Sequence, residues 1–168
     1  GKDPVIGTKA TPSYTDIDGH WAESYIEYCT SLGIVSGKGN GIFDPQANVT
    51  AAEAAKMVMT TLGYNADIEG FKGAGWDINT MAKANTLKLT ANLVNEISAN
   101  VAITREQVAQ LIYNALTTPV VQNYTGTVAN TWISSGKDAY QETLLETKFN
   151  AQKVTGVVIA NEWADLNG

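Results

Sequence analysis

Residues 49–62 read VTAAEAAKMVMTTL, and residues 103–116 read ITREQVAQLIYNAL. Written one above the other, the two segments share apolar positions and a Thr in second place. Three residues after each Thr stands a Glu or Gln, the pattern of a capping box, in which two side chains satisfy backbone N–H groups at the start of a helix. The boxes are Thr50 with Glu53 and Thr104 with Gln107. Each segment therefore predicts a helix that begins directly after its Thr, with these four residues as structural caps.

A second pair of segments repeats with nearly the same spacing. Residues 20–34 read HWAESYIEYCTSLGI and residues 75–89 read GWDINTMAKANTLKL, with Trp21 aligned to Trp76. The offset is 55 residues for these tryptophans and 54 for the capping threonines, so one deletion in the intervening loop relates the two pairs. Agreement of two separate segments on one period indicates an internal repeat. We expect two copies of a helix–loop–helix unit.

Helical periodicity gives the first helix an apolar face. The residues of that face are Trp21, Tyr25, Ile26, Cys29 and Leu32. Asp18 is expected as the N-cap of this helix, and Gly33 as the glycine that ends it. Trp21 and its counterpart Trp76 are expected to serve mainly in the core, with groove lining as the alternative.

The composition excludes several classes of protein. The chain has 168 residues, 11 Lys plus Arg against 17 Asp plus Glu, and a net charge of −6, which argues against a nucleic-acid binder. No apolar run approaches the roughly 18–20 residues of a membrane-spanning helix. Cys29 is the only cysteine, which excludes an intramolecular disulfide and a Cys-based zinc site. His20 has no catalytic partner at a diagnostic spacing. We therefore predict no enzymatic activity, no cofactor and no metal site.

The chain divides into four parts. Residues 1–13 form a lead-in, 14–64 the first repeat, 65–119 the more diverged second repeat, and 120–168 a segment of different character. In that last segment, residues 123–136 predict one or two strands, 138–149 a short helix or extended connector, and 153–163 another strand. A lone strand leaves its edges unpaired, so 153–163 should pair with 123–136 or with chain beyond residue 168. The predicted fold is mainly α: two packed helix–loop–helix repeats, then a small β-containing segment that begins a further module.

The first repeat resembles a bacterial S-layer homology domain. The opening of that family's motif is matched by Tyr14, Asp16, Ile17, His20, Trp21 and Ala22, the helix end by Gly33, Ile34, Val35 and Gly37, the loop by Gly41, Phe43 and Pro45, and the second helix by Val49, Thr50, Ala52 and Glu53. Ala51 stands where the motif has Arg, whereas the second repeat keeps Trp76 and Ile103-Thr104-Arg105. The resemblance covers residues 14–119.

The resemblance implies a function and a site. Members of this family anchor exported proteins to the bacterial cell wall by non-covalent binding of a secondary cell-wall polysaccharide that carries pyruvylated sugars, in grooves between repeats. It implies an extracellular location in the cell wall or S-layer. The ligand-binding residues carried over are Arg105, Trp21, Trp76 and Asp16. An Arg fork matches the carboxylate of a pyruvate ketal, and a Trp can stack on a sugar ring.

Simpler interpretations stay open for each residue. Asp16 can serve in a turn, and Arg105 in a surface salt bridge. The alternative function is a structural or assembly segment of a surface-layer protein without carbohydrate binding, and self-association in such a layer is an open possibility.

Overall fold

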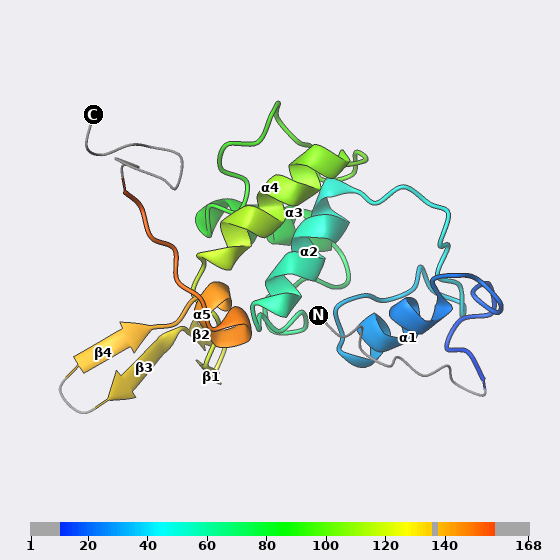
Figure 1. Cartoon of the computed structure of the whole chain (residues 1–168). Coiled ribbons are helices and arrows are strands. Elements are labelled where there is room, and N and C mark those ends of the chain that lie inside the picture. The colour runs from blue at the N-terminus through cyan, green and yellow to red at the C-terminus, as the bar shows by residue number, and fades with distance from the viewer. Residues whose placement is uncertain (1–10, 136–137, 157–168) are drawn as a thin grey trace, which may run out of the picture.

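The computed structural model describes residues 11–135 and 138–156 (Figure 1). The helices are α1 (Glu23–Ser31), α2 (Ala51–Thr61), α3 (Trp76–Thr86), α4 (Arg105–Leu116) and α5 (Leu144–Phe149). The strands are β1 (Asn123–Thr125), β2 (Val128–Asn130), β3 (Trp132–Ser135) and β4 (Asp138–Gln141). The protein is therefore mainly α, with a small β-containing part after the two repeats, as predicted.

The second helix of each repeat starts at its predicted cap. Thr50 accepts a hydrogen bond from the backbone N–H of Glu53, whose carboxylate accepts the backbone N–H of Thr50 at 2.8 Å. Thr104 and Gln107 form the same box at α4. A third box at the start of α5, not singled out in the sequence, joins Thr143 to Glu146. All three helices therefore begin where local hydrogen bonding, independent of packing, specifies it.

The start of α1 differs from the prediction. Asp18 does not cap this helix: Ala22 occupies the N-cap position, without a side-chain hydrogen bond. Asp18 lies instead inside a turn that precedes the helix and is closed by the His20 N–H and the Ile17 carbonyl at 2.9 Å. The imidazole Nδ1 of His20 accepts the N–H of Ala22 at 3.2 Å instead. The other end agrees with the prediction, since Gly33 has a φ of +69° directly after α1, which favours glycine.

Helix α2 lies between α3 and α4 and contacts both (Figure 1). Its buried residues meet those of the second repeat in one core, whose fully buried or nearly buried members are Ala54, Ala55, Met59, Leu62, Tyr64, Phe71, Ala84, Leu89, Leu111, Ala115 and Leu144. The expected packing of the two repeats therefore occurs through three of their four helices.

The two repeats also exchange backbone hydrogen bonds where α2 begins. The N–H groups of Ala51 and Ala52 donate to the carbonyls of Val101 and Ala99, both at 3.0 Å, and that of Ile103 donates to Val49 at 3.0 Å. These bonds occupy N–H groups that the first turn of a helix otherwise leaves free. Ala51 and Ala52 are 1% and 0% exposed, so the backbones approach closely here. The position of the missing motif Arg is thus a buried contact between repeats.

Helix α1 does not pack on any other helix or strand of the described residues. The prediction of a buried apolar face is wrong for most of it, including the core role of Trp21: Ile26 is 7% exposed, but Trp21 is 81% exposed. The reason is that α1 is held by loops on one side. Tyr14 is within 3.3 Å of the Thr30 hydroxyl and accepts the N–H of Gly37 at 3.0 Å. These bonds leave the opposite side of α1 uncovered.

The C-terminal segment consists of two antiparallel hairpins and α5. β1 pairs with β2 across a two-residue turn at Gly126 (φ +62°), and β3 pairs with β4, with Trp132 opposite Gln141. Residues 123–136 do form strands as predicted, but their described part contains three strands, β1, β2 and β3, rather than one or two. Residues 138–149 form β4 and α5 rather than a single helix or connector. Residues 153–156 have no regular structure, and the rest of the strand predicted at 153–163 lies outside the described residues.

This segment contributes to the core of the repeats. Leu144 of α5 is 7% exposed within that core, and the Val121 N–H donates to the Leu62 carbonyl at 2.8 Å. That residues 120–168 begin a further module stays a prediction. Among the described residues, no helix is long and apolar enough to cross a membrane, and no group of three acidic, His or Cys side chains is placed to hold a metal ion.

Candidate functional site

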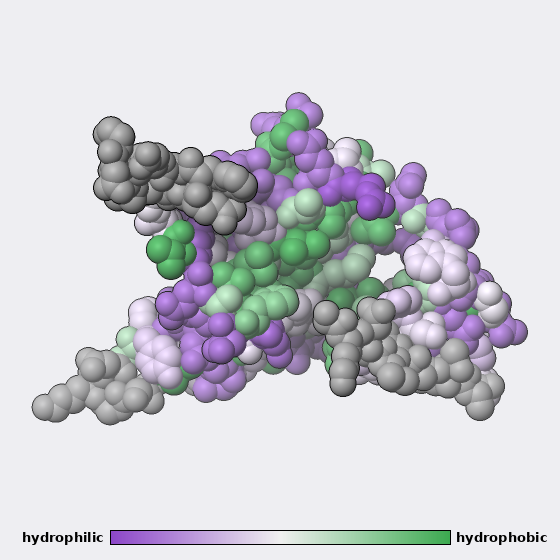
Figure 2. Space-filling view, in the orientation of Figure 1, coloured by the Kyte–Doolittle hydropathy of each residue, from purple (hydrophilic) through white to green (hydrophobic). Residues whose placement is uncertain are grey.

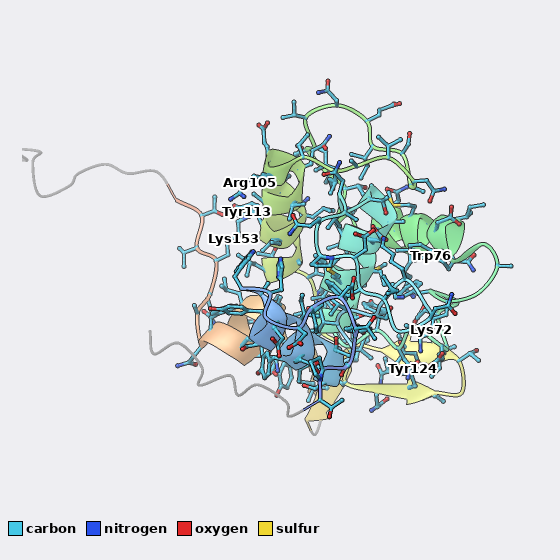
Figure 3. The ribbon with its side chains drawn as sticks, turned by 90° about the vertical axis from the view of Figure 1, so that its right-hand side faces the viewer. Lys72, Trp76, Arg105, Tyr113, Tyr124 and Lys153 are labelled. Atoms are coloured by element: carbon cyan, nitrogen blue, oxygen red, sulfur yellow. The ribbon has the colours of Figure 1, made fainter. Side chains whose placement is uncertain are left out.

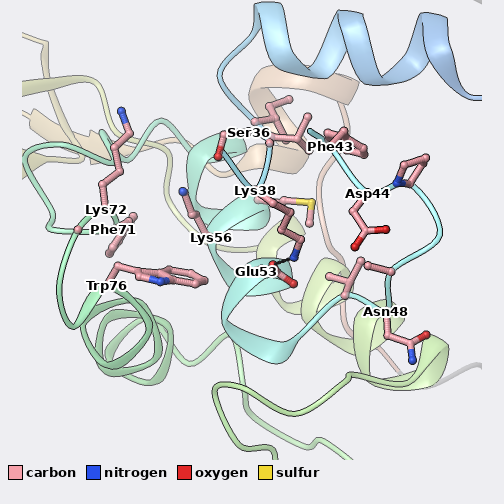
Figure 4. A pocket seen from close by; sticks show the side chains of 18 residues that line it. Ser36, Lys38, Phe43, Asp44, Asn48, Glu53, Lys56, Phe71, Lys72 and Trp76 are labelled. Carbon is pink, nitrogen blue, oxygen red and sulfur yellow. Dashed lines mark hydrogen bonds and ion pairs between the residues drawn. The ribbon is translucent and has the colours of Figure 1, made fainter. Parts of the chain in front are cut away.

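A pocket of about 450 Å³ lies between the two repeats (Figure 4). One wall is the loop of the first repeat between α1 and α2, from Ile34 to Val49. The floor is α2, through Glu53, Lys56 and Met57. The far wall is the second repeat, from Phe71 to Trp76. The pocket thus exists only because α3 packs beside α2.

Three lysines line this pocket, and they differ in their partners. Lys38 forms an ion pair with Glu53, and Lys72 forms one with Asp67 at 2.9 Å. Lys56 has no carboxylate within ion-pair distance in the described part of the chain. Burial lowers the pKa of Lys56 from its ordinary value, and the neighbouring positive charge of Lys72 lowers it further. The charges of Asp67 and Glu53 raise this pKa partly back, but neither carboxylate forms an ion pair with Lys56. A half-buried ammonium that no described carboxylate pairs with is a favourable place for an anion.

Trp76 supplies the aromatic wall. It is the first residue of α3, placed there by Gly75, whose φ of +72° at the N-cap lets the chain turn into the helix. Its half-buried ring lies beneath Lys56, with the ammonium 5.5 Å from the ring centroid (Figure 4). The pocket thus combines a cation, which can bind the carboxylate of an acidic sugar, with a flat aromatic ring, which can stack on the sugar ring.

Asp16 holds the loop wall from outside the pocket. Its two carboxylate oxygens accept the backbone N–H groups of Phe43 at 2.9 Å and Asp44 at 2.6 Å. The bond from Phe43 is the main reason that the pKa of Asp16 is lowered from its ordinary value. Phe43, whose ring centroid is 5.2 Å from that of Tyr14, is thereby turned into the pocket wall. Asp16 is not itself a lining residue.

Trp21 and Arg105 lie elsewhere on the surface. Trp21 is 81% exposed beside His20, at 5.6 Å between ring centroids. Arg105 is an exposed residue at the start of α4, without an ion pair in the described part of the chain. Figure 3 shows it on the side of the molecule away from Trp76. Of the four predicted ligand-binding residues, only Trp76 lines this pocket.

Residues 13–55 match the family model of the S-layer homology domain. The chain carries an S-layer homology domain. The matched range contains α1, the loop wall of the pocket and the first turn of α2, so the domain supplies one side of the pocket and the second repeat supplies the other.

Three relatives of this chain carry names of cell-surface, cell-wall or anchoring proteins. A cell surface protein of Thermoanaerobacter kivui is 34% identical over 107 residues, which are 64% of this chain and 13% of that protein. The middle cell wall protein of Brevibacillus brevis is 28% identical over 158 residues, 93% of this chain and 13% of that protein. A cellulosome-anchoring protein of Acetivibrio thermocellus is 36% identical over 56 residues, 33% of this chain and 12% of that protein.

The chain spans about 13% of the first two of these relatives. No solved structure matches the chain. The domain match and the names of these relatives together support a cell-wall anchoring module located in the cell envelope.

Sequence reasoning missed the lysines of the S-layer homology domain's pocket. Lys38 and Lys56 belong to the first repeat, and Lys72 belongs to the second. The absent Arg at position 51 was the signal that could have prompted a search for another cation on α2. Which of the lysines face Trp76 depends on helix packing, and no local pattern contains that information.

Proposed function

We propose that this module anchors its protein by binding the anionic group of a pyruvylated secondary cell-wall polysaccharide in the pocket between the repeats. Lys56 contacts the carboxylate, Lys72 adds positive charge, and the Trp76 ring stacks on the sugar. The observation that carries the proposal is the unpaired ammonium of Lys56 above the Trp76 ring.

The overall charge makes the local arrangement important. A chain of net charge −6 repels an acidic polymer at long range, so the attraction has to come from a site with its own positive charge. Within the pocket, an ammonium partly removed from water interacts more strongly with a carboxylate than one on the open surface does. Arg105, on the other side of the molecule, is proposed as a second and separate contact of the polymer, and Trp21 as a third. Asp16 supports the first contact by holding Phe43 and Asp44.

The test is a pelleting assay with three preparations of cell wall. The protein is mixed with native sacculi, with sacculi stripped of their secondary polymer, and with sacculi whose ketals have been removed by mild acid. Pelleting with the native preparation alone is expected. Equal binding to all three, or to none, contradicts the proposal, and unchanged binding after ketal removal contradicts the role of pyruvate.

Variants assign the binding to the pocket. Lys56→Ala is expected to weaken binding about tenfold, equivalent to about 1.4 kcal/mol, which is within the range for a hydrogen bond to a charged group. Lys148→Ala removes an exposed lysine of α5 that is not a lining residue, and is expected to bind normally. If Lys148→Ala lowers binding as much as Lys56→Ala does, net charge rather than the pocket is responsible.

The alternative function is assembly within a surface layer without carbohydrate binding. The exposed apolar side of α1 favours it, because such a side chain stripe is typical of contact surfaces. A protein that fails to pellet with native sacculi but self-associates would support this alternative.

A further inference from the structure

The uncovered side of α1 has a covered counterpart in the second repeat. On α3, the stripe that faces α2 and the core consists of Trp76, Thr80, Ala84 and Leu87. Thr80 and Ala84 are both 0% exposed. The internal repeat aligns this stripe, 55 positions earlier, with Trp21, Tyr25, Cys29 and Leu32 of the α1 region. Tyr25 is 55% exposed and Leu32 is 52% exposed. The same helix face is thus buried in the second repeat and largely exposed in the first.

For the second helix of each repeat the difference is reversed: the face is buried on α2 of the first repeat and exposed on α4 of the second. Ala55 and Met59 of α2 are 0% exposed in the core that α2 shares with α3. Their counterparts on α4, 54 positions later, are Ala109 and Tyr113, both exposed, the latter by 53%. Ile112 beside them is 49% exposed, and Figure 2 shows apolar side chains gathered over this part of the surface. The neighbour that the structure gives Tyr113 is the ammonium of Lys153, 5.2 Å from the ring centroid.

We infer that α1 of one copy of this chain packs on α4 of a second copy. The contact would repeat, between molecules, the packing of a first-type helix on a second-type helix that α3 and α2 already make within one molecule. In Figure 1, α1 lies apart from the group of α2, α3 and α4, so no other helix or strand of the described residues covers its apolar side. The inference does not rest on the pocket, because neither face includes Lys38, Lys56, Lys72 or Trp76. Trp21, proposed above as a separate contact of the polymer, lies on the α1 face, so the test variants below leave it unchanged.

The two faces differ, so the contact is heterologous. Each copy in a pair keeps one free α1 face and one free α4 face, and association continues into rings or open chains. A single helix pair buries much less than the roughly 1,600 Å² of a standard interface, so the association is weak and concentration-dependent.

Three variants with equal charge test the contact. Tyr25→Glu alters the α1 face, Ala109→Glu alters the α4 face, and Ile78→Glu adds the same charge at a 69% exposed position of α3 outside both faces. All three positions are exposed, and circular dichroism checks that each variant is folded. Sedimentation velocity measures association of the full chain up to about 1 mM, a range chosen for a weak interface.

The expected pattern is specific. The unmodified chain and Ile78→Glu associate beyond dimers, whereas Tyr25→Glu and Ala109→Glu each remain monomeric alone. An equimolar mixture of those two variants forms dimers and nothing larger, because one intact α1 face meets one intact α4 face. A monomeric unmodified chain, association of either face variant alone, or a monomeric mixture overturns the inference. The pelleting assay with native sacculi, run at a dilution where all variants are monomeric, separates this outcome from failure of the anchoring proposal.

Discussion

The ammonium of Lys56 lies 5.5 Å from the centroid of the Trp76 ring, so that a side chain of the first repeat covers an aromatic ring of the second. Both residues line the pocket between the repeats. The relationship explains how a first repeat without the motif Arg still presents a cation beside a tryptophan.

Binding to native sacculi is expected to weaken as the pH rises. The pKa of Lys56 is lowered from 10.5, so this lysine loses its charge, and with it the attraction for a carboxylate, at a pH below 10.5. Lys56→Arg keeps its positive charge at the pH where Lys56 loses its own, and is therefore expected to keep binding there. The measurement is the bound fraction against pH for both proteins. Identical pH profiles would show that Lys56 does not contact the anion.

Restoring the motif Arg in the first repeat is expected to destabilise the protein. Ala51 is 1% exposed and its N–H is bonded to Val101, so Ala51→Arg forces a long charged side chain into the contact between repeats. The expected loss is about 1–3 kcal/mol of unfolding free energy. Arg105→Ala changes the aligned position of the second repeat, which is exposed, and is expected to alter the free energy of unfolding by less than about 0.5 kcal/mol. Urea denaturation compares the two, and equal effects would contradict the buried contact.

Tyr124→Phe is expected to loosen the attachment of the β-containing segment to the second repeat. The Tyr124 hydroxyl donates to the Glu69 carboxylate at 3.0 Å and accepts the N–H of Asn65 at 2.8 Å. Losing it removes both hydrogen bonds, although Glu69 keeps its ion pair with Lys83 and the exposed Asn65 N–H can bond to water, so the expected cost is about 0.5–1.5 kcal/mol. Urea denaturation measures this loss.

The same tyrosine has a spectroscopic signature. Burial, with Glu69 contributing, raises the pKa of Tyr124 to about 12. Because the raised pKa favours the neutral form in the folded state, the stabilisation is complete below the ordinary pKa of 10 and is lost as the pH rises toward 12. In an ultraviolet titration of the native protein, Tyr124→Phe should remove a late ionisation step. A variant with an unaltered titration curve would contradict this hydrogen bonding.

Asp16→Ala is expected to free the loop wall of the pocket. The amide hydrogens of Phe43 and Asp44, now bonded to Asp16, should exchange faster with solvent, while those of α4 stay unchanged. Asp18→Ala, at an exposed neighbouring position, is the control. The pKa of Asp16 is lowered from 3.8, so its contribution is present above 3.8 and is lost as the pH falls through the lower, folded-state value. Hydrogen exchange measured by NMR checks the faster exchange of the Phe43 and Asp44 amides in Asp16→Ala. The same measurement on the unmodified protein at falling pH checks the loss of the Asp16 contribution.

Local signals in the sequence determined much of this fold. Thr50 and Thr104 begin their helices as predicted, because a capping box needs only residues three positions apart. Gly33 ends α1 for an equally local reason, its positive φ. Local patterns failed where two structures compete: residues 138–141 form a strand because β3 is available to pair with them. Their own side chains do not specify that partner.

The site depended on packing that no local signal contains. Trp21 and Trp76 occupy the same position of the internal repeat, and the sequence treats them alike. In the folded chain, Trp76 is half-buried beneath Lys56, while Trp21 is 81% exposed. The sequence by itself thus determined the starts of α2 and α4, the end of α1 and the resemblance to a family. The tertiary structure decided which tryptophan lines a pocket. The physical reason is that burial depends on which helix packs against a residue: α3 has α2 beside it, whereas α1 has no helix beside it among the described residues.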